Sequence, residues 1–518
     1  MKNTKKHFHV HKLLNHLHHV RELSPSPTFN TSPPLYRLYG LAVRHSLRDR
    51  DLRDSIPGRV KPKTFKLVLA ADPPSVRHYG FSVKSGRPGK DVLHVVDAAD
   101  PNNMRAEYTR YENHMIFTDI DLCLDHVFVT VRSRTDTKPS ALRVYKTYVK
   151  NRSDPLELVR EYPVGNSPDM LTVLENCRTV IVADEEDAYK ADGKIVDPEG
   201  HVTIVHFPDA IDYAKDMATI NLLGFGAFND RYQEMKPSGV RFVSTGNNNK
   251  LSNDLEPEYI VVDEETNKAY VILQENNAVA EVDLTTRNIT NIRGLGYKQW
   301  GSLDASDRDG GIQISYWPIR SWYLPDTAKL HRWQGHNLLF TVNEGADKEY
   351  SWFDELVRGA DIVKSGRLQF SRYDGRDARG KYCALYTYGG RSFSIWDMTP
   401  GTDQWSTLPQ VFDSGSQLEE LTALHCPHLF NRENDMDGRS DNKGSEPESL
   451  DLGVINNRLY IFVGLERPGP ILVYSLGDDV TRPRFETIFC EGIPDTSKTM
   501  EEMFEDREIY GVDPEDIQ

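Results

Sequence analysis

The chain has 518 residues, with 62 Lys+Arg against 78 Asp+Glu and a formal net charge of −16. Hydrophobic residues make up 38% of the sequence, an ordinary share for a folded protein, which excludes a disordered or collagen-like chain. No window approaches the roughly 18 consecutive apolar residues of a transmembrane helix, so no membrane span is expected in this chain.

The charge is divided unevenly along the chain. Residues 1–66 hold 14 Lys+Arg and 4 Asp+Glu, a balance of +10, and the remaining residues hold 48 against 74, a balance of −26. A body this acidic repels the phosphate backbone, so nucleic acid is not expected as a partner. Divalent cations, basic partners and mineral surfaces fit its sign, and the alternative is that the acidity only confers solubility.

Residues 1–64 form a basic, His- and Pro-rich segment. Six of the 17 histidines lie within the first 20 residues, and Ser-Pro pairs follow. This composition predicts a disordered extension, with loose metal binding by the histidines as the alternative. No continuous apolar run marks a signal peptide.

From Phe65 onward, short runs of β-branched and aromatic residues alternate with turns, which indicates an all-β chain. The runs, each four to six residues long, include 179–183, 201–206, 259–262, 269–273, 338–342, 458–463 and 470–474. Long amphipathic helical windows are scarce.

A loose repeat organises these runs. A proline followed by an acidic residue opens a strand, and a turn and a second strand follow, in copies that start at Pro168, Pro257, Pro447 and Pro514. The spacing suits propeller blades of about 40–45 residues that carry insertions. We therefore predict a β-propeller over residues 65–518, with two β-sandwich domains as the alternative. Because the chain ends soon after Pro514, the last blade is expected to be incomplete.

Acidic residues recur at equivalent positions of this repeat. The strands that open on Pro-acidic pairs should be innermost, so their carboxylates should crowd one mouth of the channel; they are Asp169, Glu256, Glu258, Glu446, Glu448 and Glu515. Crowded carboxylates repel one another unless a cation offsets them, and Ca²⁺ takes six to eight oxygen ligands. We predict a metal site that includes Glu256, Glu258, Glu446 and Glu448. The alternative is that each carboxylate accepts backbone hydrogen bonds from the next blade.

The densest local group of acids is Asp304, Asp307 and Asp309, directly before Gly310 and Gly311. This pattern is compatible with a loop that wraps a cation, although the spacing is not that of an EF-hand. An ordinary Asp/Gly turn is the alternative. The segment 434–441, which contains three aspartates, is a similar candidate or a solvated loop.

The five cysteines contain no CxxC pair, and their odd number leaves at least one unpaired within the chain. Cys426, in a His-Cys-Pro-His segment, is interpreted as part of an ordinary loop. Glycosylation sequons occur at Asn30, Asn151 and Asn288, and the last two are the predicted N-glycan sites.

Several long segments together resemble the choice-of-anchor I family. They include 197–200, 255–262, 273–280, 303–312, 341–345, 390–397, 446–452 and 463–467. The resemblance spans roughly residues 70–518 and implies a seven-bladed, WD40/YVTN-like β-propeller outside the cell. It further implies a cell-surface glycoprotein of the mesenchyme-specific type, which takes part in biomineralisation and has no well-defined catalytic reaction.

Three functions are compatible with these features. The first is an extracellular propeller that binds Ca²⁺, mineral or extracellular matrix partners through acidic loops. The second is a metal-dependent phosphoesterase in the central funnel, although the sequence lacks GxSxG, HExxH and P-loop motifs. The third is a protein-interaction scaffold without a bound ion.

Overall fold

The computed structural model describes most of the chain between residues 68 and 490. The described residues are 68–69, 79–84, 91–97, 105–133, 139–191, 194–208, 217–244, 249–299, 301–350, 353–362, 366–399, 405–432 and 435–490. The predicted extension of residues 1–64, the sequon at Asn30 and the repeat that opens at Pro514 lie outside them.

The described residues form six antiparallel four-stranded sheets that follow one another along the chain. The first three consist of β1 (Val68–Leu69), β2 (Tyr79–Lys84), β3 (Asp91–Asp97) and β4 (Arg105–Glu112); β5 (Met115–Cys123), β6 (His126–Ser133), β7 (Ala141–Lys146) and β8 (Leu158–Pro163); and β9 (Pro168–Val173), β10 (Thr179–Asp184), β13 (His201–His206) and β14 (Thr219–Gly224). The last three consist of β15 (Pro257–Asp263), β16 (Lys268–Leu273), β17 (Ala278–Asp283) and β18 (Asn288–Gly294); β23 (Ala328–Trp333), β24 (His336–Asn343), β30 (Ser392–Asp397) and β31 (Gln410–Asp413); and β32 (Pro447–Ile455), β33 (Arg458–Leu465), β34 (Ile471–Leu476) and β35 (Arg484–Phe489).

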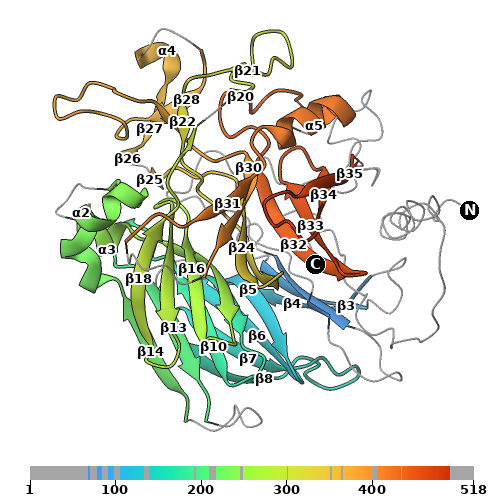
Figure 1. The fold of residues 1–518 in the computed structure, drawn as a ribbon. Coiled ribbons are helices and arrows are strands. Elements are labelled where there is room, and N and C mark those ends of the chain that lie inside the picture. The colour runs from blue at the N-terminus through green and yellow to red at the C-terminus, as the bar shows by residue number, and fades with distance from the viewer. Residues whose placement is uncertain are drawn as a thin grey trace, which may run out of the picture.

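The sheets are the blades of a β-propeller. The first strand of each sheet contacts the first strand of the next, through the pairs β5–β9, β9–β15, β15–β23 and β23–β32. Figure 1 shows the sheets arranged side by side. The prediction of a β-propeller is confirmed, and the two-sandwich alternative is wrong because the third sheet packs against a different neighbour on each face, whereas the sheets of a sandwich pack as one pair.

The strands are apolar on both faces because their alternate side chains pack against different neighbouring sheets. Val180 and Val182 of β10 pack in the core between the second and third sheets. Ile181 and Ala183 of the same strand pack in the core between the third and fourth sheets. Successive residues of a strand point to opposite faces, so a blade with a neighbour on each side buries both sets.

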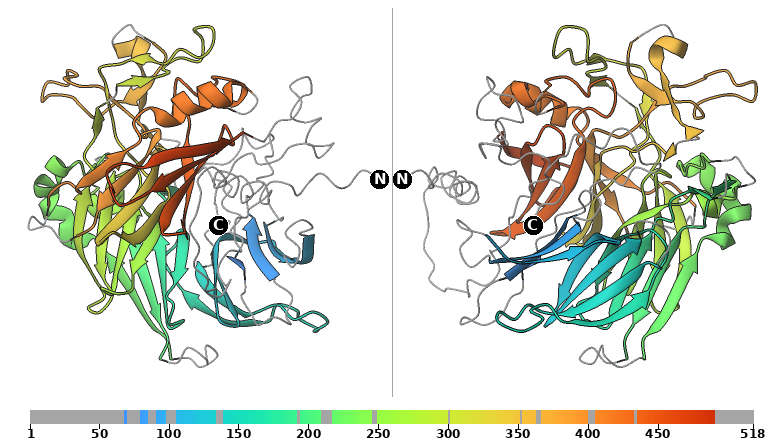
Figure 2. Two further views of the ribbon diagram at one scale, coloured as in Figure 1. Left: turned by 45° about the vertical axis from the view of Figure 1, so that its right-hand side comes forward. Right: turned by 180° about the vertical axis from the view of Figure 1, so that it is seen from behind.

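Antiparallel pairing brings two kinds of connection to one face of the propeller. The end of each second strand and the start of each first strand lie on the same side of a blade, and the long insertions emerge there. We call the described residues of three insertions, 295–327, 344–391 and 414–446, the cap. Both views of Figure 2 show its yellow and orange segments on the same side of the sheets.

Short elements build the cap and its surroundings. The cap contains β19 (Lys298–Gln299), β20 (Ser302–Leu303), β21 (Ser315–Tyr316), β22 (Arg320–Ser321), β25 (Glu349–Tyr350), β26 (Phe353–Asp354), β27 (Leu356–Arg358), β28 (Gln369–Ser371), β29 (Tyr386–Thr387), α4 (Gly359–Ile362), α5 (Gln417–His425) and η4 (Pro427–Leu429). The connections before β13 and β15 add β11 (Tyr189–Ala191), β12 (Lys194–Val196), η2 (Gly226–Arg231), α2 (Tyr232–Met235), η3 (Lys236–Ser238) and α3 (Leu251–Asp254). No helix in the described part of the chain has the length and apolar character needed to cross a bilayer.

Two disulfides join parts that the strands do not connect. Cys123, at the end of β5, bonds Cys177 in the turn between β9 and β10, and so links the second and third blades. Cys426, directly after α5, bonds Cys490 at the end of β35, and so ties the cap to the outer strand of the last sheet. Cys383 is free and exposed, which identifies the unpaired cysteine.

We expect the Cys123→Ser/Cys177→Ser double variant to lose stability. The disulfide closes a segment with a sequence separation of 54, and a loop of this length corresponds to about 4 kcal/mol in the chain-entropy account. Urea unfolding followed by tryptophan fluorescence should show a lower midpoint for the double variant. Cys383→Ser is the control and should leave the midpoint unchanged; an equal loss in both variants would contradict the linking role.

Candidate functional site

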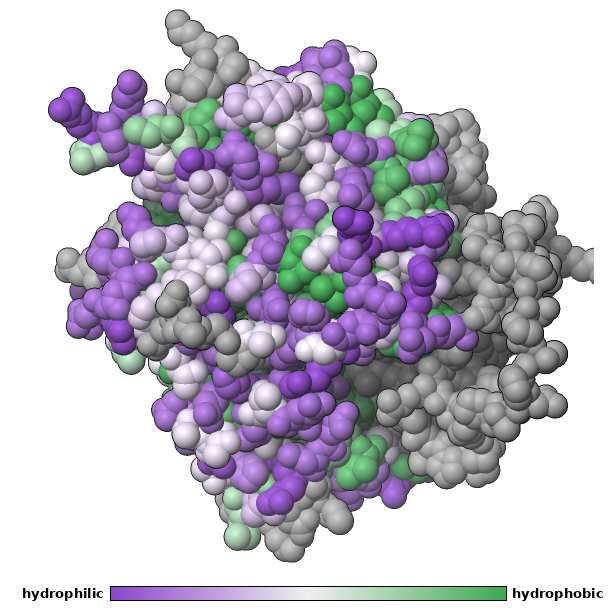
Figure 3. Space-filling model, in the orientation of Figure 1, coloured by the Kyte–Doolittle hydropathy of each residue, from purple (hydrophilic) through white to green (hydrophobic). Residues whose placement is uncertain are grey.

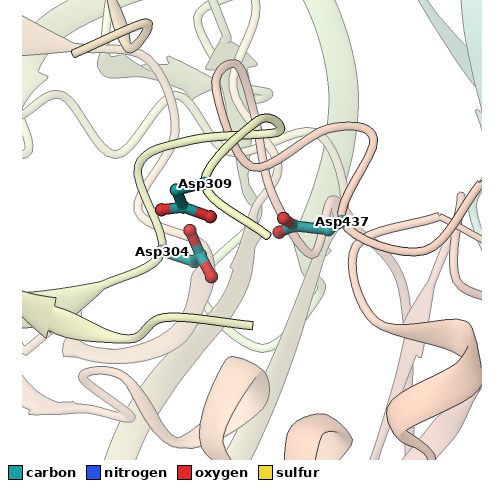
Figure 4. A group of neighbouring side chains, drawn as sticks. All are labelled: Asp304, Asp309 and Asp437. Carbon is teal, nitrogen blue, oxygen red and sulfur yellow. The ribbon is translucent and has the colours of Figure 1, made fainter. Parts of the chain in front are cut away.

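Three aspartates from two separate insertions of the cap meet in one cluster. Asp304 and Asp309 lie in the connection between β18 and β23, and Asp437 lies in the connection between β31 and β32. One carboxylate oxygen of each lies within 4.8 Å of the other two. Figure 4 shows the three side chains converging from the two loops. None of the three forms an ion pair with a lysine or arginine of the described residues.

The first loop is shaped around Asp304. The Asp304 Oδ1 accepts a hydrogen bond from the Ser306 N–H at 3.2 Å, and Oδ2 accepts one from the Gln313 N–H at 2.5 Å. The backbone returns through Gly310 and Gly311, whose φ angles of 103° and 122° are accessible to glycine at little cost. The Asp-rich, Gly-Gly sequence therefore forms a closed loop with two of its carboxylates turned toward Asp437.

Asn431 and Ser440 hold the Asp437 side of the cluster. The Ser440 hydroxyl donates to the Asp437 Oδ1 at 2.5 Å and accepts a hydrogen bond from the Asn431 Nδ2 at 2.7 Å. The Asn431 side chain is fully buried, and its Oδ1 has no hydrogen-bond partner among the described residues. An oxygen left without a donor beside buried carboxylates is suited to a cation.

The pKa shifts of the clustered carboxyl groups also favour a bound cation. Burial, together with the charges of Asp304, Asp309 and Asp307, raises the pKa of Asp437 to about 7. Burial also raises the pKa of Asp304, and the nearby Glu419 and Asp309 carboxylates add to the effect. Carboxyl groups that resist ionisation for these reasons gain most from a divalent cation placed between them.

The third aspartate of the predicted loop has a different partner. The Arg367 guanidinium donates to both oxygens of Asp307, at 3.1 Å for the Nη2–Oδ2 bond. Although burial opposes the change, these bonds lower the pKa of Asp307. The structure thus brings Asp304 and Asp309 together with Asp437, and turns Asp307 toward Arg367.

Glu446 belongs to a second group of buried carboxylates, which has its own cations. One oxygen each of Glu344, Glu446 and Glu466 lies within 4.8 Å of the other two. The three cations around them are Lys443, 3.0 Å from Glu344; Arg467, 2.5 Å from Glu466 and 3.2 Å from Glu446; and Arg439, which binds both oxygens of Glu446. Three side-chain cations therefore face three carboxylates in this group.

Glu256 is also paired. Its Oε2 lies 2.7 Å from the Nζ of Lys348, a fully buried lysine from the cap that also donates to the Asp254 carbonyl at 2.8 Å. Burial raises the pKa of Glu256 despite this pair, and the neighbouring Glu275 adds to the shift. Glu258 is buried and Glu448 half-buried; neither joins a group of three close carboxylates in the described chain. The metal-binding roles predicted for these residues stay predictions.

Bonds from a carboxylate to the backbone of the next blade occur at two residues that the sequence analysis did not name. Asp119 and Asp121 of β5 accept hydrogen bonds from the Leu171 and Val173 N–H groups of β9, both at 2.9 Å. These aspartates lie within a strand, without a preceding proline, so the repeat pattern did not single them out.

A model of the choice-of-anchor I domain matches residues 74–479, in agreement with the resemblance seen in the sequence. A mesenchyme-specific cell surface glycoprotein of Strongylocentrotus purpuratus is 27% identical over 337 residues, which cover 54% of this chain and 43% of that protein. Gigasin-3a of Magallana gigas is 36% identical over 160 residues, 29% of this chain and 54% of that protein. The chain thus spans about half the length of the curated relatives it matches.

Solved structures with similar folds are distant. The periplasmic gluconolactonase PpgL of Pseudomonas aeruginosa is 13% identical, covers 82% of this chain and 84% of its own, and has a TM-score of 0.36. Hsv2 of Kluyveromyces lactis is 8% identical, with coverages of 79% and 82% and a TM-score of 0.35. At these values the likenesses carry no argument about function.

We expect Glu446→Gln to lower stability by about 2 kcal/mol, with or without calcium. The substitution leaves Arg439 without its carboxylate, while Arg467 keeps Glu466, and an uncompensated, largely buried charge is costly. Thermal unfolding in EDTA and in calcium chloride measures the effect, with the exposed Glu420→Gln as the control. A loss seen only in calcium chloride would instead place a metal at Glu446.

Proposed function

Because the chain belongs to the choice-of-anchor I family, we propose that it is an extracellular or cell-surface β-propeller glycoprotein that binds Ca²⁺ through its cap. We further propose that it engages mineral or matrix partners in biomineralisation. The observation that carries the proposal is the cluster of Asp304, Asp309 and Asp437. A curated relative is a mesenchyme-specific cell surface glycoprotein, which supports the location.

The donor set of the cluster suits calcium. All three side chains offer carboxylate oxygens, and the buried Asn431, whose Nδ2 donates to the Ser440 that holds Asp437, has an Oδ1 with no partner among the described residues. Hard cations such as Ca²⁺ take only oxygen ligands, whereas zinc and copper sites use nitrogen or sulfur. Asp304, Asp309 and Asp437 would hold the ion, and Asn431 would support the site from within.

The covalent chemistry of the chain supports a location outside the cell. Four of the five cysteines form two disulfides, at Cys123–Cys177 and Cys426–Cys490. Disulfides of this kind form and persist in oxidising compartments and are rare in the cytosol.

The acidity of the body supports a mineral or matrix role. Residues 67–518 carry a balance of −26, and a chain of this sign attracts calcium ions exposed on a mineral or carried by a matrix.

We expect calcium to bind the wild-type protein and to raise its unfolding temperature, because it relieves repulsion among three close carboxylates, of which Asp304 and Asp437 are buried. Calorimetric titration should show binding that Asp304→Asn and Asp437→Asn each weaken at least about tenfold. Asp435→Asn is the matched control, since Asp435 lies in the same loop, is exposed and is not part of the cluster. The proposal is refuted if millimolar calcium produces no binding heat and no shift in the unfolding temperature.

The same titration should depend on pH. Calcium binds the ionised form of Asp437, whose pKa is about 7, so the affinity should be lower at pH 6 than at pH 8. Without calcium, the stability of the fold should instead fall as the pH rises. A carboxyl group with a raised pKa favours the folded state while it is protonated, and this contribution is lost as the pH rises through 7. An affinity that does not change between pH 6 and pH 8 would contradict the assignment of Asp437.

We expect N-glycans at Asn151 and Asn288 when the protein passes through a secretory pathway. Asn151 lies in the connection between β7 and β8, Asn288 begins the outermost strand β18, and both are exposed. Asn151→Gln and Asn288→Gln should each remove one glycan, seen as a faster band on a gel. The exposed Asn176, outside any sequon, is the control position; a wild-type protein that glycosidase treatment does not shift would contradict the assignment.

A further inference from the structure

We propose that a basic hairpin of the cap, residues 372–384, docks an acidic polypeptide segment of a protein partner. We call these residues the cap hairpin. The segment projects from the cap at the upper left of Figure 1, and a strongly hydrophilic projection occupies the same position in the space-filling view of Figure 3. The proposal rests on the hairpin's fixed backbone, its unpaired cations and its aromatic side chains, and it does not depend on a bound calcium ion.

The hairpin has a defined backbone. The Asp377 N–H donates to the Lys381 carbonyl at 2.9 Å, and the Cys383 N–H donates to the Gly375 carbonyl at 2.7 Å. The Asp377 Oδ1 accepts hydrogen bonds from the Arg379 and Lys381 N–H groups, at 2.8 Å and 3.0 Å. A tip held in this way loses little conformational entropy when a partner binds.

The base of the hairpin is fixed to the body of the protein. Asp374 accepts hydrogen bonds from Arg241, a buried residue outside the cap, and from the Trp322 Nε1, both at 2.8 Å. The Trp322 ring stacks on Tyr386 with 4.5 Å between centroids. The tip is therefore an extension of a packed polar and aromatic base.

The cations at the tip are not neutralised by acidic side chains of the described residues. Residues 376–381 contain Arg376, Arg379 and Lys381, all exposed, and a single acid, Asp377. None of the three cations forms an ion pair with a carboxylate of the described residues. Since the Asp377 carboxylate is engaged in the turn, the tip presents a concentrated positive charge on a body with a balance of −26.

Aromatic side chains lie beside these cations. The Arg376 guanidinium lies 4.3 Å from the centre of the Tyr382 ring, and its Nη2 donates to the Tyr382 hydroxyl at 2.7 Å. The Tyr373 ring stacks on Phe353 with 5.3 Å between centroids and is 45% exposed. Tyrosine and arginine are the residues that most often dominate the binding energy of protein interfaces.

The chemistry of the tip selects an acidic polypeptide. The planar guanidinium groups of Arg376 and Arg379 match the geometry of a carboxylate and bind it through two parallel hydrogen bonds. The exposed Tyr373 offers an apolar face and a hydroxyl to neighbouring side chains and backbone groups. A partner segment rich in Asp and Glu complements both features, whereas the rest of this acidic chain repels such a segment and so confines it to the hairpin.

The test measures the binding of a fluorescent glutamate-rich peptide to the full chain in EDTA, which removes calcium as a bridge between carboxylates. The anisotropy of the peptide should report binding at about 50 mM NaCl that weakens strongly at about 500 mM. The triple variant Arg376→Ala/Arg379→Ala/Lys381→Ala should bind at least about tenfold more weakly. Its thermal unfolding should match the wild type because all three side chains are exposed.

A second triple variant removes the same charge elsewhere. Arg458→Ala/Arg482→Ala/Arg484→Ala changes three solvent-accessible cations near the last blade, and it should leave the peptide affinity within about twofold of the wild type. The proposal is overturned if both variants weaken binding equally or if the wild type does not bind the peptide. It is also overturned if heparin binds the hairpin and the peptide does not, since the partner would then be a sulfated polysaccharide.

Discussion

Buried carboxylates at the mouth of the propeller must be compensated, and the cap supplies the cations that compensate them. Lys348 of one insertion reaches Glu256, directly before β15, and Lys443 of another reaches Glu344, directly after β24. An unpaired charge in such a place costs several kcal/mol, so the propeller and its cap are stable only together. The insertions are therefore part of the folded core, although along the sequence they only connect one strand to the next.

Because buried carboxylates need a cation, a group of close carboxylates without one indicates where an ion could bind. Cations of the cap form ion pairs with four glutamates, Glu256, Glu344, Glu419 and Glu446. By contrast, Asp304, Asp309 and Asp437 converge without a lysine or arginine partner in the described chain. The buried Asp304 and Asp437 converge with the exposed Asp309 and have no cationic partner among the described residues, so an added cation is stabilising there. The absence of a paired base thus distinguishes this cluster from the equally acidic group around Glu446.

The positions of several strands could be predicted from the sequence, whereas the side-chain partners of the acidic residues could not. The apolar run 201–206 is β13 to the residue, and the run 269–273 lies within β16, because the pattern that buries both faces of a blade is local. The meeting of Asp304 with Asp437 depends on two insertions 133 positions apart, and no local pattern encodes it. For the same reason Glu256 and Glu446 resembled open ligands in the sequence, since Lys348 and Arg439 come from other segments or from turns whose path the sequence does not reveal.

The placement of both proposed sites on the cap follows from how a propeller divides its tasks. Blade residues are constrained on two faces by their neighbours, so a change there costs packing energy, while connections tolerate new side chains as long as their ends are held. Here the ends are held firmly: the disulfide Cys426–Cys490 fixes the start of the segment that carries Asn431 and Asp437, and the Asp374–Arg241 pair fixes the base of the cap hairpin. An acidic site and a basic site can then coexist on one cap, because each is attached separately to a rigid frame and neither has to move for the other to bind.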